Sequence, residues 1–355
     1  MEMPMPRESY PGKLSVPVRH SSRIPRDSRH FAAETLPVML LQINHLKMDF
    51  GTNSEALRAI DDVSLEIGAG ETVCLVGESG CGKSVTALSI AKLVPTPPAS
   101  YVGGEILLNG RNVLTMSSAE LGSIRGGVVS YIFQEPAAAL NPVFRVGSQI
   151  KESLKLHRPE KATNDEVIRL LKLVGIPAPE SRLRNYPFEM SGGMQQRVMI
   201  AMALASEPKL LVADEPTTAL DVTIQAQILD LLRDLKQRLG MAILLITHNL
   251  GIVGDMADRV AVMYAGQIVE LSPAKELLRR PLHPYTRALM ASVPKLRSEA
   301  DRLSAIPGNV PSIGHFPPGC RFAPRCIIAR PECSQKIPDL VEAEPGRFVR
   351  CPFWK

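Results

Sequence analysis

A glycine-rich octapeptide at residues 77–84 places the strongest restriction on the fold of this 355-residue chain. It fits the pattern G-x-x-x-x-G-K-[ST], in which glycines let the backbone curl around a small anionic ligand. A short apolar run at 71–76 precedes it, and helical spacing at 84–93 follows it. Because a strand, a loop and a helix in this order are the context that the pattern requires, the sequence predicts an α/β core built around this loop.

The octapeptide has the chemistry of a site for ATP and Mg²⁺. Its backbone N–H groups and the start of the following helix can donate to phosphate oxygens. Lys83 is predicted to reach the β- and γ-phosphates, and the Ser84 hydroxyl to ligate Mg²⁺. A chance match in a chain of this length has odds on the order of one in a hundred, which disfavours a glycine turn without a ligand. The residues predicted to bind the nucleotide here are Gly77, Glu78, Ser79, Gly80, Cys81, Gly82, Lys83, Ser84 and Val85.

Two acidic residues follow another apolar run. Asp214 and Glu215 come directly after residues 210–213, which have the composition of a buried strand. Neighbouring side chains of an extended chain point to opposite sides, so one acid can face a metal ion while the other faces water. Asp214 is predicted to hold Mg²⁺, and Glu215 to polarise the water that attacks the γ-phosphate. Such a pair is ordinary on a protein surface, and only the octapeptide makes a catalytic role the better explanation.

Two more polar side chains end strand-like runs. His248 follows residues 242–247, and Gln134 follows residues 128–133. A histidine at a strand end is usually structural, but here it is predicted to contact the γ-phosphate and to orient the water or Glu215. The amide of Gln134 can touch both Mg²⁺ and the water, so Gln134 is predicted to sense the γ-phosphate.

These runs together predict an α/β fold with a mixed, largely parallel sheet. Before the octapeptide, residues 37–67 have the pattern of two antiparallel strands. An inserted α-helical subdomain is predicted at about 136–208, where the strand pattern disappears. From residue 272 onward, closely spaced prolines predict a loop-rich C-terminal module. The helices expected in the insertion are 146–156, 165–173 and 193–205.

The first 37 residues differ from the rest in composition. Much of the net charge of +5 comes from the first thirty residues, where six lysines and arginines outnumber three acidic residues. Frequent Pro, Ser and Arg without helical periodicity predict a disordered basic tail, and attraction to anionic lipid headgroups is the alternative. The longest apolar runs of the chain, such as 241–247, have strand length, so no membrane-spanning helix is expected.

Residues 191–197, Ser-Gly-Gly-Met-Gln-Gln-Arg, place a serine and two glycines at a helix start, which is a second anion site. With the octapeptide, they make the chain from residue 38 to 355 resemble the ATP-binding subunit of an ABC transporter of the dipeptide and oligopeptide importer branch. The resemblance implies that Ser191, Gly192 and Gly193 contact ATP held by a partner subunit in a head-to-tail dimer. Residues 218–221 resemble the D-loop of this family, which places Asp221 at the same dimer interface.

The resemblance extends to two further segments. Phe50 is the candidate for the aromatic side chain that stacks on adenine, with Tyr131 and Tyr101 as alternatives and a core role as the ordinary explanation. Residues 134–142 resemble the Q-loop region, where the helical subdomain hinges and meets the membrane permease.

Four of the six cysteines lie near the end of the chain, spaced C-x5-C-x6-C-x17-C. Four thiolates can hold Zn²⁺ or a [4Fe-4S] cluster, and structural zinc sites usually have pairs two to four residues apart, which these are not. The resemblance implies the iron–sulfur cluster, with zinc and free thiols as alternatives. Arg321, Arg325 and Arg330 are expected to offset its negative charge. The predicted ligands are Cys320, Cys326, Cys333 and Cys351.

The function implied is ATP hydrolysis that powers uptake of dipeptides or oligopeptides through a separate permease. The implied partners are a second, similar but distinct ATPase subunit, two permease subunits and, indirectly, an extracellular or periplasmic peptide-binding protein, without nucleic acid. The chain is then peripheral, on the cytoplasmic face of the inner membrane. A soluble ABC ATPase of translation or DNA repair is the alternative, disfavoured by the single octapeptide and the lack of sustained heptads. The domains expected are a tail at 1–37, an ATPase domain at 38–271 and a C-terminal extension at 272–355.

Overall fold

A computed structural model describes residues 39–51, 56–218, 220–293 and 306–355. The predicted tail and Ala219 of the predicted D-loop lie outside these residues. The chain divides into two units, residues 1–36 and 37–355, and everything below concerns the second.

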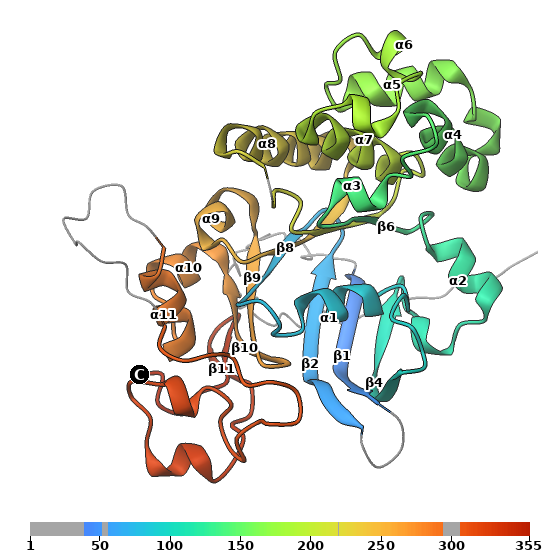
Figure 1. Ribbon diagram of the computed structural model, residues 1–355. Helices are drawn as coiled ribbons and strands as arrows, with labels where there is room; N and C mark the ends of the chain where they lie inside the picture. Colours follow the sequence, from blue (N-terminus) through green and yellow to red (C-terminus); the bar gives the residue numbers. More distant parts are fainter. Residues whose placement is uncertain (1–38, 52–55, 219, 294–305) are drawn as a thin grey trace, which may run out of the picture. The chain divides into compact units, whose positions relative to one another are not determined.

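An eight-stranded mixed sheet forms the centre of this unit, with the strand order β11-β12-β10-β9-β3-β8-β7-β6 (Figure 1). Its parallel part runs from β9 through β3, β8 and β7 to β6. These strands form where short apolar runs are buried on both faces. The sequence predicted four of them: β3 before the octapeptide, and β6, β7 and β8. The bounds of the parallel strands are β3 Thr72–Val76, β6 Val129–Ile132, β7 Leu210–Asp214, β8 Ala242–Thr247 and β9 Arg259–Tyr264.

A second, antiparallel sheet has the order β2-β1-β4-β5. It confirms the antiparallel N-terminal strands and adds β4, which the sequence analysis missed. Along β3, Val73 and Leu75 pack with this sheet and with α1, whereas Cys74 and Val76 pack with the helices on the opposite face. The bounds are β1 Met39–Phe50, β2 Leu57–Gly68, β4 Ala99–Leu108, β5 Arg111–Asn112 and α1 Lys83–Ser89.

Helices fill the chain between β6 and β7, where the sequence predicted helical segments. Figure 1 shows α4, α5, α6 and α7 gathered in one cluster beside α8. Helices α4 and α5 both pack against α7, and Leu154, Leu170 and Val198 are among the residues buried there. The bounds between β6 and β7 are α3 Pro136–Ala139, α4 Val146–His157, η3 Pro159–Lys161, α5 Asn164–Leu173, α6 Pro179–Arg182, η4 Pro187–Glu189 and α7 Gly192–Leu204. Before β6 lie η2 Val113–Thr115 and α2 Ser118–Ile124, and after β7 lie α8 Val222–Leu239, η5 Leu250–Ile252 and α9 Val253–Met256.

The C-terminal part is more regular than its prolines suggested. Pro284 begins a helix instead of breaking one, because proline at the first helical position gives up an N–H that has no partner there anyway. Strand β12 pairs with β10, so the end of the chain extends the central sheet. The carboxylate of Glu270 in β10 is fully buried and accepts hydrogen bonds from the backbone N–H groups of Leu282 and His283. The bounds are β10 Gln267–Pro273, α10 Ala274–Arg279, α11 Pro284–Ala291, η6 Ala323–Arg325, η7 Pro331–Ser334, β11 Val341–Glu344 and β12 Arg347–Val349.

Within the ranges that the structure describes, every helix is too short or too polar to reach across a lipid bilayer.

Candidate active site

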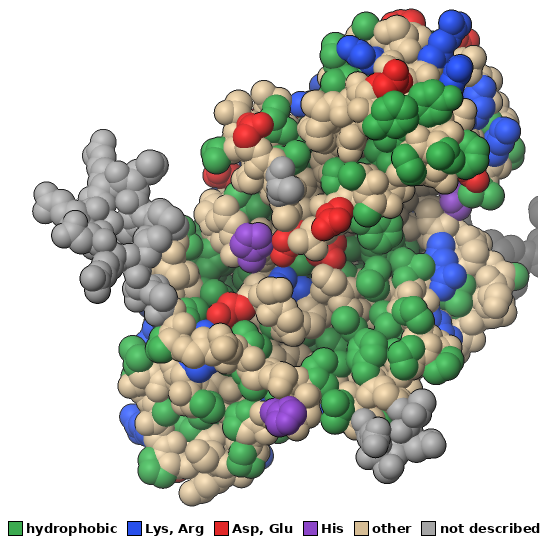
Figure 2. Space-filling view, viewed as in Figure 1, with side chains coloured by type: hydrophobic (Ala, Val, Ile, Leu, Met, Phe, Trp, Pro, Cys, Tyr) green, Lys and Arg blue, Asp and Glu red, His purple; other side chains and the backbone are tan. Residues whose placement is uncertain are grey.

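A cavity of about 710 Å³ lies at the octapeptide and brings several of the predicted residues together. Figure 2 shows acidic side chains and a histidine gathered at the centre of this face, below the cluster of helices. Strands β1 and β2, loops that follow strands of the central sheet, and the C-terminal part contribute to its walls. The lining residues are Phe50, Ala59, Gly77, Glu78, Ser79, Gly80, Gly82, Lys83, Ser84, Val85, Gln134, Glu215, Thr218, His248, Leu289, Ser292 and Ile313.

Two glycines allow the octapeptide its tight path. A Cβ on Gly77 would lie 2.2 Å from the carbonyl oxygen of Met263, so only glycine fits there. Gly82 has φ 106 and precedes α1, a conformation that costs other residues energy. The ammonium group of Lys83 bends back over the loop and donates to the carbonyl oxygens of Gly77 and Glu78 at 2.8 and 2.9 Å. The Lys83 ammonium therefore holds together the first two residues of the loop.

Asp214 ends β7 beside the octapeptide. Burial raises the pKa of its carboxyl, and hydrogen bonding to Ser84 only partly counteracts this effect. Its Oδ1 atom is buried and has no hydrogen-bond partner among the described residues. A buried carboxylate oxygen without a partner, next to a serine hydroxyl, is a donor set suited to a hard cation such as Mg²⁺. Asp214 and Ser84 therefore fit the metal that was predicted for them.

Glu215 lies at the centre of a hydrogen-bonded group. Gln134 Nε2 donates to its Oε2 at 3.2 Å, and His248 Nδ1 lies 3.2 Å from its Oε1. The Thr218 hydroxyl donates to Oε2 at 2.8 Å, a contact that the sequence analysis missed because it assigned Thr218 only to the predicted D-loop. Burial acts to raise the pKa of Glu215, but hydrogen bonds from Thr218 and His248 outweigh it, so the pKa is lowered. Glu215 is thus an ionised, oriented carboxylate, as a general base must be.

Phe50 lines the same cavity at the end of β1. Its two alternatives do not line it: the Tyr131 hydroxyl donates to the carbonyl oxygen of Ala87, and its ring stacks on Phe133. The hydroxyl of Tyr101 is buried. Of the three aromatic candidates, Phe50 alone lines this cavity.

One predicted contact residue of the octapeptide faces elsewhere. Cys81 is 1% exposed, and its side chain belongs to the apolar core between the two sheets. Only its backbone remains available to a ligand, because the side chain does not line the cavity. A cysteine in this loop is explained by packing and not by reactivity.

Four other predicted contact residues lie away from the cavity, at the starts of two helices. Ser191 caps α7 through a bond from the Met194 N–H, and Asp221 caps α8 through a bond from the Ile224 N–H. Gly193 packs so closely on Ile224 that a Cβ on the glycine would lie 2.9 Å from it. None of the four lines the cavity within the described part of the chain. The residues set apart in this way are Ser191, Gly192, Gly193 and Asp221.

The four C-terminal cysteines surround a separate cavity of about 330 Å³. Around a single zinc ion, sulfurs at about 2.3 Å from the metal would lie within about 4.6 Å of one another. No three His, Cys, Asp or Glu side chains in the described ranges group tightly enough to hold an ion. Two of the three arginines expected to offset a cluster's charge are used otherwise, since Arg321 pairs with Asp61 and Arg325 with Glu78. The cysteines that line this cavity are Cys320, Cys326, Cys333 and Cys351.

Comparisons with known proteins identify the family of the chain. Residues 60–218 match the family model "ABC transporter", and residues 269–333 match "Oligopeptide/dipeptide transporter, C-terminal region". A Sinorhizobium fredii protein named "probable peptide ABC transporter ATP-binding protein" is 51% identical over 316 residues, covering 88% of this chain and 94% of the relative. The oligopeptide transport ATP-binding protein AppD of Bacillus subtilis is 49% identical over 314 residues, covering 88% and 96%.

A solved structure shares the fold. It is a dimeric ATP-binding cassette in a post-hydrolysis state, bound to ADP and phosphate, with a TM-score of 0.58 and 26% identity. The match covers 66% of this chain and 98% of that chain. The chain therefore belongs to the ABC transporter family of ATP-binding proteins, and it carries the C-terminal region of the oligopeptide/dipeptide branch.

Proposed function

We propose that the chain is the ATP-hydrolysing subunit of an importer that takes up dipeptides or oligopeptides through a separate permease. The observation that carries the proposal is the group around Glu215, a lowered-pKa carboxylate held by Gln134, Thr218 and His248 within the cavity of the phosphate loop. The peptide cargo rests on the names of the relatives and on the matched C-terminal region.

In the proposed mechanism the side chains divide the work around the γ-phosphate. Lys83 exchanges its loop carbonyls for phosphate oxygens. Glu215 accepts a proton from the attacking water, while Gln134 and His248 hold that water in line. Asp214 and Ser84 would hold Mg²⁺, which neutralises charge on the β- and γ-phosphates when it is bound.

The residues left outside the cavity support a dimer with a second ATPase subunit. Ser191, Gly192 and Gly193 are exposed or half-buried at the start of α7, and they do not line the chain's own cavity. In the proposed head-to-tail arrangement they cap the γ-phosphate bound by the partner, and Asp221 lies at the same interface. We propose a similar but distinct chain as this partner.

The helical insertion, residues 136–208, is proposed to meet the two permease subunits. Close to Gln134 the side chains of Val143 and Phe144 are 72% and 56% exposed, an apolar surface suited to a partner. Contact there places the chain peripherally at the cytoplasmic face of the membrane, with the peptide-binding protein reached only through the permease. The proposed domains are the tail at 1–37, the ATPase domain at 38–271 and the extension from 272 to 355, although β10 crosses the last boundary.

The rival function, a soluble ABC ATPase of translation or DNA repair, has less support. It leaves the match of residues 269–333 to a transporter C-terminal region unexplained.

The function is tested with the whole complex in lipid vesicles. Co-expressed with its permease subunits and binding protein, the chain is expected to hydrolyse ATP only with magnesium, and faster when peptide and binding protein are supplied. Labelled peptide should accumulate in the compartment opposite to the ATPase. A complex that hydrolyses ATP at one rate with or without peptide, and moves none, contradicts the proposal.

We further propose a [4Fe-4S] cluster at the four C-terminal cysteines. The support is that four thiols line one cavity and that four thiolates are the ligand set of such a cluster. In this site Arg330 lies against Phe353, and its backbone N–H donates to Cys333 Sγ at 3.5 Å. The cluster's role is proposed to be structural.

The cluster is tested by metal analysis of complex purified without oxygen. About four iron atoms per chain and broad visible absorbance are expected, and Cys333→Ser should lose both. Cys74→Ala, which removes a buried thiol of the central sheet, should keep the iron. Zinc in place of iron, or a parent chain without metal, contradicts this assignment.

A further inference from the structure

The second residue of the phosphate loop is held by the end of the chain. Both carboxylate oxygens of Glu78 accept hydrogen bonds from the guanidinium of Arg325, at 2.7 and 2.9 Å. The backbone N–H of Glu78 donates to the Tyr285 hydroxyl at 2.9 Å. Neither contact is made by the strand or helix that flanks the loop, so the loop's position depends on residues more than 200 positions away.

Arg325 is itself fixed on every side. Its side chain is 5% exposed, in the turn η6 between Cys320 and Cys326. Its Nε donates to the carbonyl oxygen of Pro307 at 2.8 Å, and Nη1 lies 3.4 Å from the Tyr264 hydroxyl. A planar guanidinium that makes two parallel bonds to a carboxylate sets both the distance and the direction of that carboxylate. The pair is therefore a rigid connection and not a loose surface contact.

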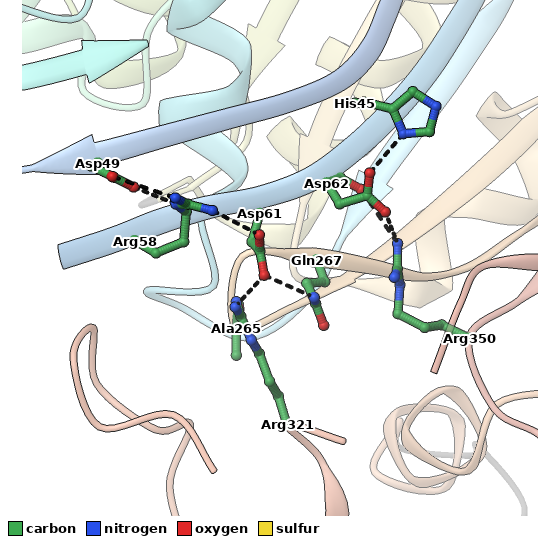
Figure 3. Close-up of polar contacts among 9 residues, drawn as sticks. All are labelled: His45, Asp49, Arg58, Asp61, Asp62, Ala265, Gln267, Arg321 and Arg350. Carbon is green, nitrogen blue, oxygen red and sulfur yellow. Dashed lines mark hydrogen bonds and ion pairs between the residues drawn. The ribbon is translucent and has the colours of Figure 1, made fainter. Parts of the chain in front are cut away.

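A second connection runs beside the first, through the turn between β9 and β10. Arg321 pairs with Asp61 on β2 at 2.6 Å and donates to the carbonyl oxygen of Ala265 (Figure 3). The next residue in that turn, Gly266, donates its N–H to the Cys81 carbonyl oxygen of the phosphate loop at 2.8 Å. The segment that supplies Arg325 therefore supports the loop at two points.

The charge of Glu78 matters because this residue lines the nucleotide cavity. A triphosphate that enters there is strongly negative, and an unpaired carboxylate on the loop repels it. The repulsion falls when a cation pairs with the carboxylate. Because the Arg325 side chain is buried, dissolved salt screens the attraction between Arg325 and Glu78 only weakly. Arg325 can thus act on ATP without touching it.

We propose that Arg325 is a positioning residue for nucleotide binding, which neutralises Glu78 and holds the phosphate loop, so that the C-terminal segment sets the ATP affinity of the core. This inference rests on the proposed function. It assigns the C-terminal segment a role at the nucleotide site in addition to its proposed cysteine cluster.

The test compares steady-state kinetics of whole complexes that carry single and double variants. Arg325→Ala is expected to raise the KM for Mg-ATP about tenfold, because a cavity-lining carboxylate loses its partner. Its kcat at saturating ATP should stay within about twofold, since the variant leaves the group around Glu215 in place. Adding Glu78→Gln to Arg325→Ala should return the KM most of the way to the parent value, because the unpaired charge is then gone.

A matched control separates nucleotide positioning from general stability. Arg350 belongs to the same C-terminal segment and pairs with Asp62 of β2 at 3.2 Å, but it has no bond to the phosphate loop (Figure 3). Arg350→Ala should lower the Tm of the complex while leaving the KM within about twofold of the parent. If Arg325→Ala does not fold, Arg325→Lys replaces it in the test. Its KM is expected to be about threefold above the parent value, because lysine keeps the charge but cannot make the two paired hydrogen bonds to Glu78.

The possible outcomes distinguish a failure of the Arg325 inference from a failure of the proposed function. An unchanged KM in folded Arg325→Ala or Arg325→Lys overturns the inference alone, as does a double variant no better than Arg325→Ala. A parent complex without magnesium-dependent turnover overturns the proposed function, and the inference with it.

Discussion

Replacing Glu215 by glutamine is expected to lower steady-state ATP hydrolysis by about 10²- to 10⁴-fold while ATP still binds. Glutamine keeps the size of the side chain and can still bond to Thr218 and Gln134, but it cannot accept a proton from water. Because the pKa of Glu215 is lowered, the parent carboxylate is ionised at neutral pH, so the variant removes a charge that is present. The steady-state rate of phosphate release at saturating Mg-ATP measures the effect.

The same variant should accumulate a closed dimer, since the bound triphosphate persists between the two subunits. Size-exclusion chromatography with Mg-ATP, compared with Mg-ADP, detects it. Glu160→Gln serves as the control: this exposed glutamate lies in η3, and its change should leave both hydrolysis and dimerisation as in the parent. Hydrolysis by the Glu215 variant at the parent rate would show that another group activates the water.

Lys83→Ala is expected to weaken Mg-ATP binding about tenfold to a hundredfold. The ammonium group donates to two loop carbonyls, so its loss removes both a cation for the β- and γ-phosphates and two hydrogen bonds within the loop. Equilibrium titration with a fluorescent ATP analogue measures the affinity. The two variants thus fail at different steps: Lys83→Ala binds ATP weakly, whereas Glu215→Gln binds ATP but hydrolyses it slowly.

Lys151→Ala is the matched control for the lysine. Lys151 is half-buried on α4, where its ammonium donates to Asn164 at 2.6 Å away from the nucleotide cavity, and its removal should not alter the affinity. The Tm of both variants shows whether the chains fold. A folded Lys83→Ala chain with the parent's affinity would mean that the loop's N–H groups alone hold the phosphates.

The centre of the fold and much of the site followed from local patterns. Buried parallel strands are continuous apolar runs, so the strand before the octapeptide and the runs that end at Asp214 and at His248 were recognisable one by one. Parallel strands then bring their carboxyl ends to one edge, which is why Gln134, Glu215 and His248 meet. The loop pattern supplied the ligand chemistry.

The features that the sequence did not predict depend on contacts between residues far apart in the chain. Strand β4 has two adjacent glycines and becomes a strand only by pairing with β1, so its own sequence gives a weak signal. The α10 and α11 helices were hidden by their prolines, one of which begins α11. No local pattern indicates that Arg325 reaches Glu78, because 247 positions separate them.

The pairing of β12 with β10 has a consequence for how such proteins are divided and recombined. A chain cut after the ATPase motifs would expose a bare strand edge at β10, and the buried carboxylate of Glu270 would lose the N–H groups of Leu282 and His283. The cassette and its extension thus share one sheet within one compact unit, although they match two separate family models. A lineage that gains or discards this extension must also redesign the sheet edge to which it is joined.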